Sequence, residues 1–177
     1  MRITDKYIFF WEGELSNFYP CNLSYLSDNT WIKCTTSEQM FMWFKAITFQ
    51  DYDTAKLILQ AETPKEAKKL GRKVKGFDES TWNLVKEKIM RFVLYKKFMY
   101  NAKLRDYLLN PEFDGKIFVE ASPYDKIWGV GLGQDDPLID DENNWLGQNL
   151  LGKLLTDLRE IIKIECNNEK QYWDFKK

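Results

Sequence analysis

The stretch Cys34-Thr-Thr-Ser-Glu-Gln-Met-Phe-Met-Trp-Phe-Lys-Ala-Ile-Thr-Phe-Gln50 is the most informative segment of the 177-residue chain. Within it only Glu38 and Lys45 are charged, and apolar residues occur on nearly every side of the helix that it predicts. A helix that is apolar nearly all round is buried in a protein. The stretch therefore predicts a core helix over residues 36–49. Thr35, Thr36 or Ser37 could cap it, and Thr35 and Glu38 have the spacing of a capping box.

Glu38 and Lys45 are seven residues apart, which places them on one stripe of that helix, about 20° apart and about 10 Å along its axis. Uncompensated charges on a buried helix cost on the order of several kcal/mol each. One explanation is structural: Glu38 complements the helix dipole and Lys45 extends its amine to solvent. The other is functional, because a desolvated lysine is a usable nucleophile and a buried carboxylate a general acid or base. Spacing alone does not choose between them.

The rest of the chain alternates short strand patterns with longer helical ones. We expect strands at 6–11, 22–26, 31–34 and 116–120, a hairpin turn at 27–29, a loop with a possible short strand at 121–133, and helices at 51–61, 64–71, 80–109 (one helix or two abutting ones) and 146–164. This order predicts the α+β fold class, as a single, mainly helical domain with a small β-sheet over residues 1–164. Residues 165–177 are expected to form a loosely ordered polar C-terminal tail.

The composition removes several classes of function. The 26 basic and 27 acidic residues give a net charge of −1, so any binding to nucleic acid would need a local basic patch. The chain has no histidine, which excludes Ser-His-Asp and Cys-His catalysis and every histidine-ligated metal site. A Mg²⁺ or Mn²⁺ site built from carboxylates alone stays open but has no motif behind it, and we expect no metal and no cofactor.

The three cysteines have no metal-binding spacing and favour free thiols in a reducing compartment. No apolar run approaches the length of about 18 residues needed for a membrane span, and the N-terminus lacks the apolar stretch of a signal peptide. The expected location is cytoplasmic.

Three further segments carry side chains suited to binding. The loop Ser122–Gly133 places Asp125 beside Trp128 and contains glycines that would let the backbone approach a ligand, although the residues alone favour a structural turn with a core tryptophan. The stretch 65–75 has six basic residues, of which Arg72 is the best suited to a phosphate, while a solvated helix face explains the lysines.

Near the C-terminus, Trp145–Gly152 is expected to open the last helix. The N–H groups of that helix start, with Asn149, could bind an anion or a ribose, and close packing at Gly152 is the structural alternative. Trp82 could stack on a base or fill the core.

Taken in order, these segments resemble the NADAR (YbiA-like) family of N-glycosidases over about residues 7–162. The motifs that carry the resemblance are Phe10-Trp11, Leu15–Phe18, Thr36–Gln39, Phe44–Ala46, Ala67–Arg72, Trp82–Met90, Lys97-Phe98, Val119-Glu120, Ser122–Asp125, Trp128–Gly131, Gly147–Gly152 and Leu158-Arg159. No single motif decides the match; their number, order and spacing do.

The resemblance implies a hydrolase that cleaves an N-glycosidic bond at ribose C1. Glu38 and Lys45 inherit the catalytic roles, together with Asp125. Substrate binding is expected from Asn17, Phe18, Ser37, Gly71, Arg72, Trp82, Trp128, Gly129, Gly131, Asn149 and Gly152.

Two substrate classes are known in the family. One is ADP-ribose linked to guanine, in a nucleotide or in nucleic acid; the other comprises the phosphoribosylamino-pyrimidine intermediates of riboflavin synthesis. Members of the riboflavin branch tend to have histidine where this chain has Gln39, which favours the ADP-ribosyl-guanine substrate. A non-catalytic ADP-ribose-binding module is the alternative from another class, and a scaffold or interaction domain is a third.

Overall fold

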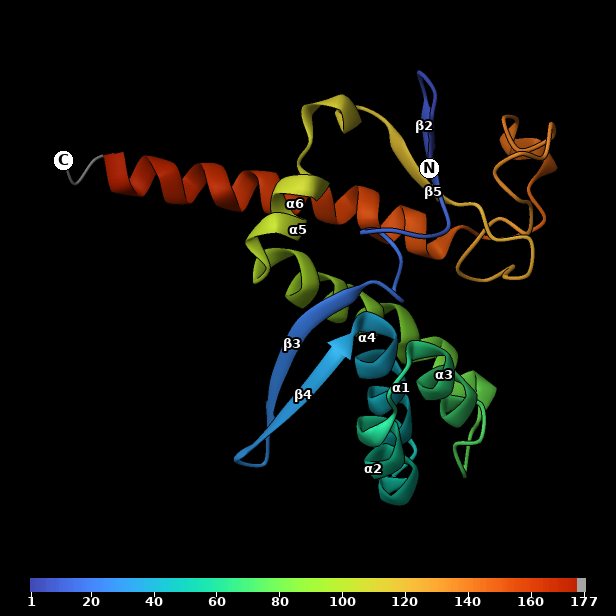
Figure 1. Cartoon of the computed structure of the whole chain (residues 1–177), viewed down its shortest axis with the longest axis vertical. Helices are drawn as coiled ribbons and strands as arrows, with labels where there is room; N and C mark the ends of the chain where they lie inside the picture. Colours follow the sequence, from blue (N-terminus) through green and yellow to red (C-terminus); the bar gives the residue numbers. More distant parts are fainter. Residues whose placement is uncertain (175–177) are drawn as a thin grey trace. The chain divides into compact units, whose positions relative to one another are not determined.

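The computed structural model describes the backbone of residues 1–174 and the side chains of residues 1–168. The chain forms two compact units. The central unit is Ser16–Ala102, and the terminal unit combines Met1–Leu15 with the chain from Lys103 onward. The fold belongs to the expected α+β class, with helices and two small sheets (Figure 1).

The central unit begins with a β-hairpin of the antiparallel strands β3 (Pro20–Ser27) and β4 (Thr30–Thr36). Asp28 and Asn29 form its turn and both have positive φ, at 46° and 63°. Two-residue turns with positive φ match the twist of paired strands, and Asp and Asn tolerate this conformation. The predicted hairpin is therefore confirmed.

Four helices follow: α1 (Ser37–Thr48), α2 (Tyr52–Gln60), α3 (Pro64–Gly71) and α4 (Glu79–Met99). Helix α1 packs against the other three and against β4, which explains its apolar circumference (Figure 1). The predicted core helix is confirmed, and Thr36 is the one of its three candidate caps that the structure uses. Thr36 is the N-cap and accepts a hydrogen bond from the Gln39 N–H (3.2 Å), so the capping pair is one residue further along than Thr35 and Glu38.

The segment 80–109 forms two helices, α4 and α5 (Ala102–Leu108). Helix α4 starts after Asp78, whose carboxylate accepts a hydrogen bond from the Thr81 N–H (2.7 Å). The sequence pattern left one helix or two open, and the structure resolves this as two.

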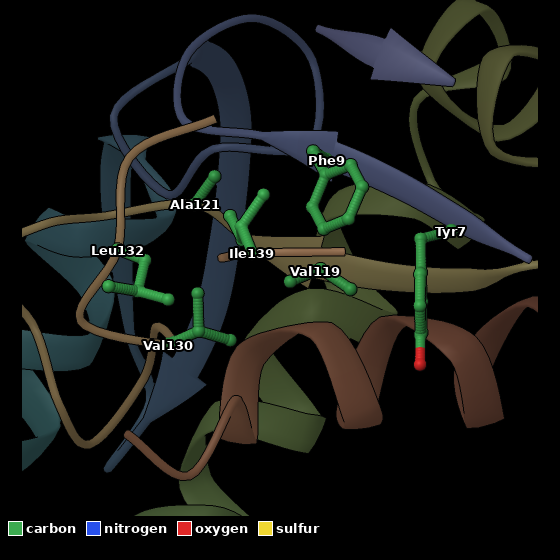
Figure 2. Close-up of a cluster of buried hydrophobic side chains, with 7 residues drawn as sticks. All are labelled: Tyr7, Phe9, Val119, Ala121, Val130, Leu132 and Ile139. Atoms are coloured by element: carbon green, nitrogen blue, oxygen red, sulfur yellow. The ribbon is translucent and has the colours of Figure 1, made fainter. Parts of the chain in front are cut away.

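The terminal unit contains a three-stranded sheet in the order β1 (Arg2–Ile3), β2 (Tyr7–Phe10) and β5 (Ile117–Glu120). Strands β2 and β5 are parallel although more than a hundred residues separate them in sequence. Buried side chains from these strands and from the following loop pack together in a cluster of Tyr7, Phe9, Val119, Ala121, Val130, Leu132 and Ile139 (Figure 2). Residues 121–133 contain no strand, so the possible short strand of this loop is wrong.

Helix α6 (Leu150–Asp174) packs against β5 and differs from the expected helix at both ends. It begins four residues later, because the N–H groups of residues 148–151 donate to the carbonyls of the loop at 126–129. It also continues through residues 165–174, so most of the expected polar tail is helical. Among the described residues, no helix is long and apolar enough to cross a membrane.

Candidate active site

Helix α1 places Glu38 in its first turn, where the side chain is buried with only 4% of the residue exposed. The N–H of Glu38 donates to the carbonyl oxygen of Asn17 (2.9 Å), so the turn before β3 is tied to the start of α1. Asn17 is itself buried. Position at a helix start and a buried setting together keep a carboxylate available for proton transfer.

Lys45 lies two turns further along α1 and is half-buried. Burial lowers the pKa of Lys45, and the positive charge of Arg72 lowers it further, whereas the negative charge of Glu38 acts in the opposite direction. The structure thus brings together three of the residues expected from the sequence. A lysine with a lowered pKa has a larger neutral, nucleophilic fraction near neutral pH.

Aromatic rings form one wall of this environment. The Lys45 ammonium lies 4.2 Å from the centre of the Phe77 ring and 5.7 Å from that of Trp82. Trp82 is buried and packs against Phe41 at 5.2 Å, and Phe49 contacts the Phe77 ring at 5.3 Å. The expected proximity of Trp82 to the reactive pair is therefore found, while Phe77 was not expected. Its only sequence signal is an aromatic residue between a turn glycine and a helix cap.

Two further polar residues near Glu38 are deeply buried. The Oδ1 atom of Asn17 has no hydrogen-bond partner among the described residues, although its Nδ2 donates to Met90 Sδ (3.5 Å). Ser37 is fully buried beside Cys21, and burial raises the pKa of the Cys21 thiol. A buried acceptor without a partner is costly, so Asn17 Oδ1 is available to a ligand or a water molecule.

Phe18 and Gly71 occupy different settings in the same unit. The Phe18 ring is 39% exposed and lies 5.6 Å from the Lys68 amine, so it is open to stacking. Gly71 is buried where α3 meets α1, and a methyl group there would overlap Met42. Close helix packing therefore accounts for Gly71 without a ligand.

The side chain of Gln39 serves the fold. Its Nε2 donates to the carbonyls of Ile58 (2.9 Å) and Ala61 (3.2 Å) at the end of α2, and its Oε1 accepts from the Thr35 N–H (2.9 Å). These hydrogen bonds involve both the Nε2 and the Oε1 atom of the Gln39 side chain. Packing between α1 and α2 therefore accounts for a glutamine at this position without reference to the substrate.

The remaining expected site residues lie in the terminal unit, on the loop before η2 (Glu142–Asn144) and at the start of α6. Asp125 Oδ1 accepts hydrogen bonds from the N–H groups of Ile127 (2.9 Å) and Trp128 (2.8 Å). The Asp125 N–H donates to Ser122 Oγ (3.2 Å). Asp125 therefore orders this loop through one of its carboxylate oxygens.

The start of α6 favours the structural alternative. Asn149 is fully buried; its Oδ1 accepts from the Glu120 N–H and its Nδ2 donates to the Phe118 carbonyl, both at 3.0 Å. The N–H groups that might have bound an anion are occupied by the carbonyls of the loop. A methyl group on Gly152 would overlap the Phe118 carbonyl, and one on Gly129 would lie 2.8 Å from the Glu120 carbonyl.

Gly131 has a φ of +73°, a conformation that favours glycine whether or not a ligand is bound. Within residues 1–168, no three carboxylate or cysteine side chains gather in a group able to hold a metal ion. The thiols of Cys21, Cys34 and Cys166 are free.

The fold is similar to that of a known class of small α+β proteins. The NMR structure of YbiA from Escherichia coli superimposes with a TM-score of 0.70 at 30% sequence identity, covering 93% of this chain and 89% of that one. The family model described as the NADAR domain matches residues 9–163. The chain belongs to the NADAR family.

Two relatives show how this similarity extends. Protein irg-1 of Caenorhabditis elegans is 37% identical, with 90% of this chain and 81% of the relative aligned. An N-glycosidase of Acanthamoeba polyphaga mimivirus is also 37% identical, over 89% of this chain and 96% of the relative. The name of the viral relative supports a hydrolase that acts on N-glycosidic bonds.

Proposed function

We propose that this protein hydrolyses the bond between ribose C1 and a nitrogen atom, with Glu38 and Lys45 as its reactive pair. The observation that carries the proposal is the environment of Lys45: a half-buried amine between aromatic rings, with its pKa lowered by burial and by Arg72, on the same helix as a buried carboxylate. The N-glycosidase relative supports the same reaction class.

In the proposed reaction, the bond from C1 to the leaving nitrogen breaks and its electron pair stays on that nitrogen. Glu38 donates a proton to the departing amine. The neutral Lys45 amine donates its lone pair to C1, and one of its protons passes to the ring oxygen as the C1–O bond breaks, which holds the open sugar as a Schiff base. Water then adds to C1; one of its protons returns to Glu38 and the other passes to the lysine nitrogen, which leaves as the neutral amine.

The substrate that we propose is ADP-ribose attached to guanine. The positive charge around Lys45 supports this substrate. Arg72 lies close enough to Lys45 to lower the pKa of that amine, and the stretch 65–75 that contains Arg72 also carries exposed lysines. A pyrophosphate offers this patch two negative groups, whereas the riboflavin intermediates carry one phosphate ester. A free nucleotide and a nucleic acid are the two possible carriers of this guanine, and the assay below compares both.

Binding roles for Asn17, Phe18 and Trp82 belong to the same proposal. Asn17 Oδ1 offers a buried acceptor, and the exposed Phe18 ring offers a stacking surface. The roles of Asp125 and Trp128 follow from their spacing in the sequence and from the family resemblance, and are tested separately by substitution of each residue.

The experiment is a mass-spectrometric assay on ADP-ribosyl-guanosine, an ADP-ribosylated oligonucleotide and a phosphoribosylamino-pyrimidine, side by side. We expect ADP-ribose from the first two substrates, together with guanosine and the unmodified oligonucleotide respectively, and a loss of about 100-fold or more in Lys45→Ala and in Glu38→Gln. Lys56→Ala, on the exposed face of α2, is the matched control and should retain activity.

Full hydrolysis by Lys45→Ala would refute the covalent role. Borohydride should trap the adduct on the wild-type chain and not on Lys45→Ala. Hydrolysis of the pyrimidine substrate alone would overturn the substrate assignment, and intact ligand after prolonged incubation would favour a binding module.

A further inference from the structure

Phe77 is the outward-facing neighbour of the Lys45 amine. The two aromatic rings near this amine differ in exposure: Trp82 is buried, whereas Phe77 is 44% exposed. Phe77 is also the closer ring, at 4.2 Å from Nζ against 5.7 Å for Trp82. Phe77 is therefore both the nearer and the more exposed of these two rings.

The loop that carries Phe77 is fixed on both sides of it. The Lys75 N–H donates to Asp51 Oδ2 (2.8 Å), and Gly76 turns the backbone with a φ of +69°. On the other side, Asp78 caps α4. Contact with the Phe49 ring completes the arrangement, so the Phe77 ring is held in place before any ligand binds.

These anchors persist over a wide pH range. Hydrogen bonds from Lys75 and Thr54 lower the pKa of Asp51, and bonds from Ser80 and Thr81 lower the pKa of Asp78 to about 2. Both carboxylates therefore stay ionised while an amine such as Lys45 titrates. Both anchors of the loop are therefore present throughout that titration.

The Phe77 ring has two opposite effects on the pKa of Lys45: its face raises the pKa, and the burial that it provides lowers it. The face of an aromatic ring attracts the ammonium form, while exclusion of water favours the neutral amine. The charged groups that act on Lys45 are Glu38 from α1 and Arg72 from the end of α3; the loop and α4 contribute the uncharged rings.

We propose that Phe77 is a positioning residue for Lys45, whose ring holds the amine at the reaction centre and sets how readily it binds a proton. The proposal rests on the proposed function in so far as Lys45 is the reactive amine. It adds a residue that the family motifs of this chain did not single out.

The test measures the titration of Lys45 directly, by NMR of the chain labelled with ¹³C at lysine Cε, with Lys45→Met identifying the signal. Phe77→Leu keeps an apolar side chain of similar size and removes the ring. We expect this change to lower the pKa of Lys45, with about a two- to fivefold change in its proton affinity. Phe77→Tyr should preserve the wild-type titration, and the pH profile of kcat/KM should move in parallel.

Tyr52→Leu is the control, because Tyr52 is an exposed aromatic residue at the start of α2. It should leave the titration of Lys45 unchanged. Thermal unfolding of each variant verifies that it is folded, and Phe77→Met replaces Phe77→Leu if that variant is unfolded.

An unchanged or raised pKa of Lys45 in the ring-less variant would overturn the inference, as would an equal effect of Tyr52→Leu. The NMR result does not depend on turnover. If Lys45→Ala remains active, the proposed function fails while the titration still decides the role of Phe77.

Discussion

Substitution of Gly152 by alanine separates a packing role from a binding role at the start of α6. The new methyl group would overlap the Phe118 carbonyl of β5 and would lie 2.7 Å from Asn149 Nδ2, where ordinary contacts are 3.4–4 Å. Because a backbone carbonyl has no alternative rotamer, the helix must move away from the strand. That movement would also stretch the two 3.0 Å hydrogen bonds between Asn149 and β5.

The expected cost follows from these contacts. Overpacking costs about 1–3 kcal/mol, and each weakened hydrogen bond about 0.5–1.5 kcal/mol. Alanine has a higher helix propensity than glycine, which offsets about 1 kcal/mol of this loss in the free energy of unfolding. The net loss in the free energy of unfolding is about 3 kcal/mol, which corresponds to a fall in Tm of about 6–12 °C for a chain of this size.

Urea denaturation followed by tryptophan fluorescence and circular dichroism measures this loss. Gly133→Ala is the control, because a methyl group there has nothing within 4 Å and the residue does not need positive φ. We expect that control to stay within about 0.5 kcal/mol of the wild type. Equal stability of the two variants, with a raised KM for Gly152→Ala alone, would refute the packing argument in favour of substrate contact.

Three other outcomes are expected. In the native protein at pH 8 an aromatic disulfide reagent should react quickly with Cys166 alone, because Cys21 and Cys34 are buried and burial raises the pKa of Cys34 to about 12; three fast thiols would contradict this. Since the pKa of Asp78 is about 2 when folded, against a usual 3.8, its contribution to stability is present above that usual value and lost as the pH falls towards 2; Asp78→Asn should therefore show a flatter dependence of Tm on acid pH. Arg159→Met should lower the free energy of unfolding by about 3 kcal/mol in urea titrations, because the buried guanidinium donates to two backbone carbonyls that would lose their partner; a loss below about 1 kcal/mol would show that water replaces it.

Local signals in the sequence were sufficient for much of the central unit. The hairpin turn at Asp28-Asn29, the threonine and proline at the start of α3, and the apolar circumference of α1 each act over a few residues. Such signals fix an element before any distant contact forms, which is why these elements were predicted close to their observed bounds.

Distant contacts decided what the sequence missed. The start of α6 depends on hydrogen bonds to a loop some twenty residues earlier, and the role of Gln39 depends on the end of α2. Neither contact can be predicted from residues that are adjacent in the sequence. The basic stretch 65–75 suggested Arg72 as a phosphate ligand but did not place it beside Lys45, and Phe77 was not suggested at all.

The two oxygens of Asp51 give the loop between α3 and α4 a fixed length. One oxygen accepts from the Thr54 N–H inside α2 and the other from the Lys75 N–H in that loop. Surface loops usually accept insertions at little cost, yet an extra residue next to Lys75 would break this bridge and displace the ring beside Lys45. In relatives, changes of length here should therefore accompany loss of the acidic residue before α2, whereas the hairpin turn at Asp28-Asn29 is free to vary alone.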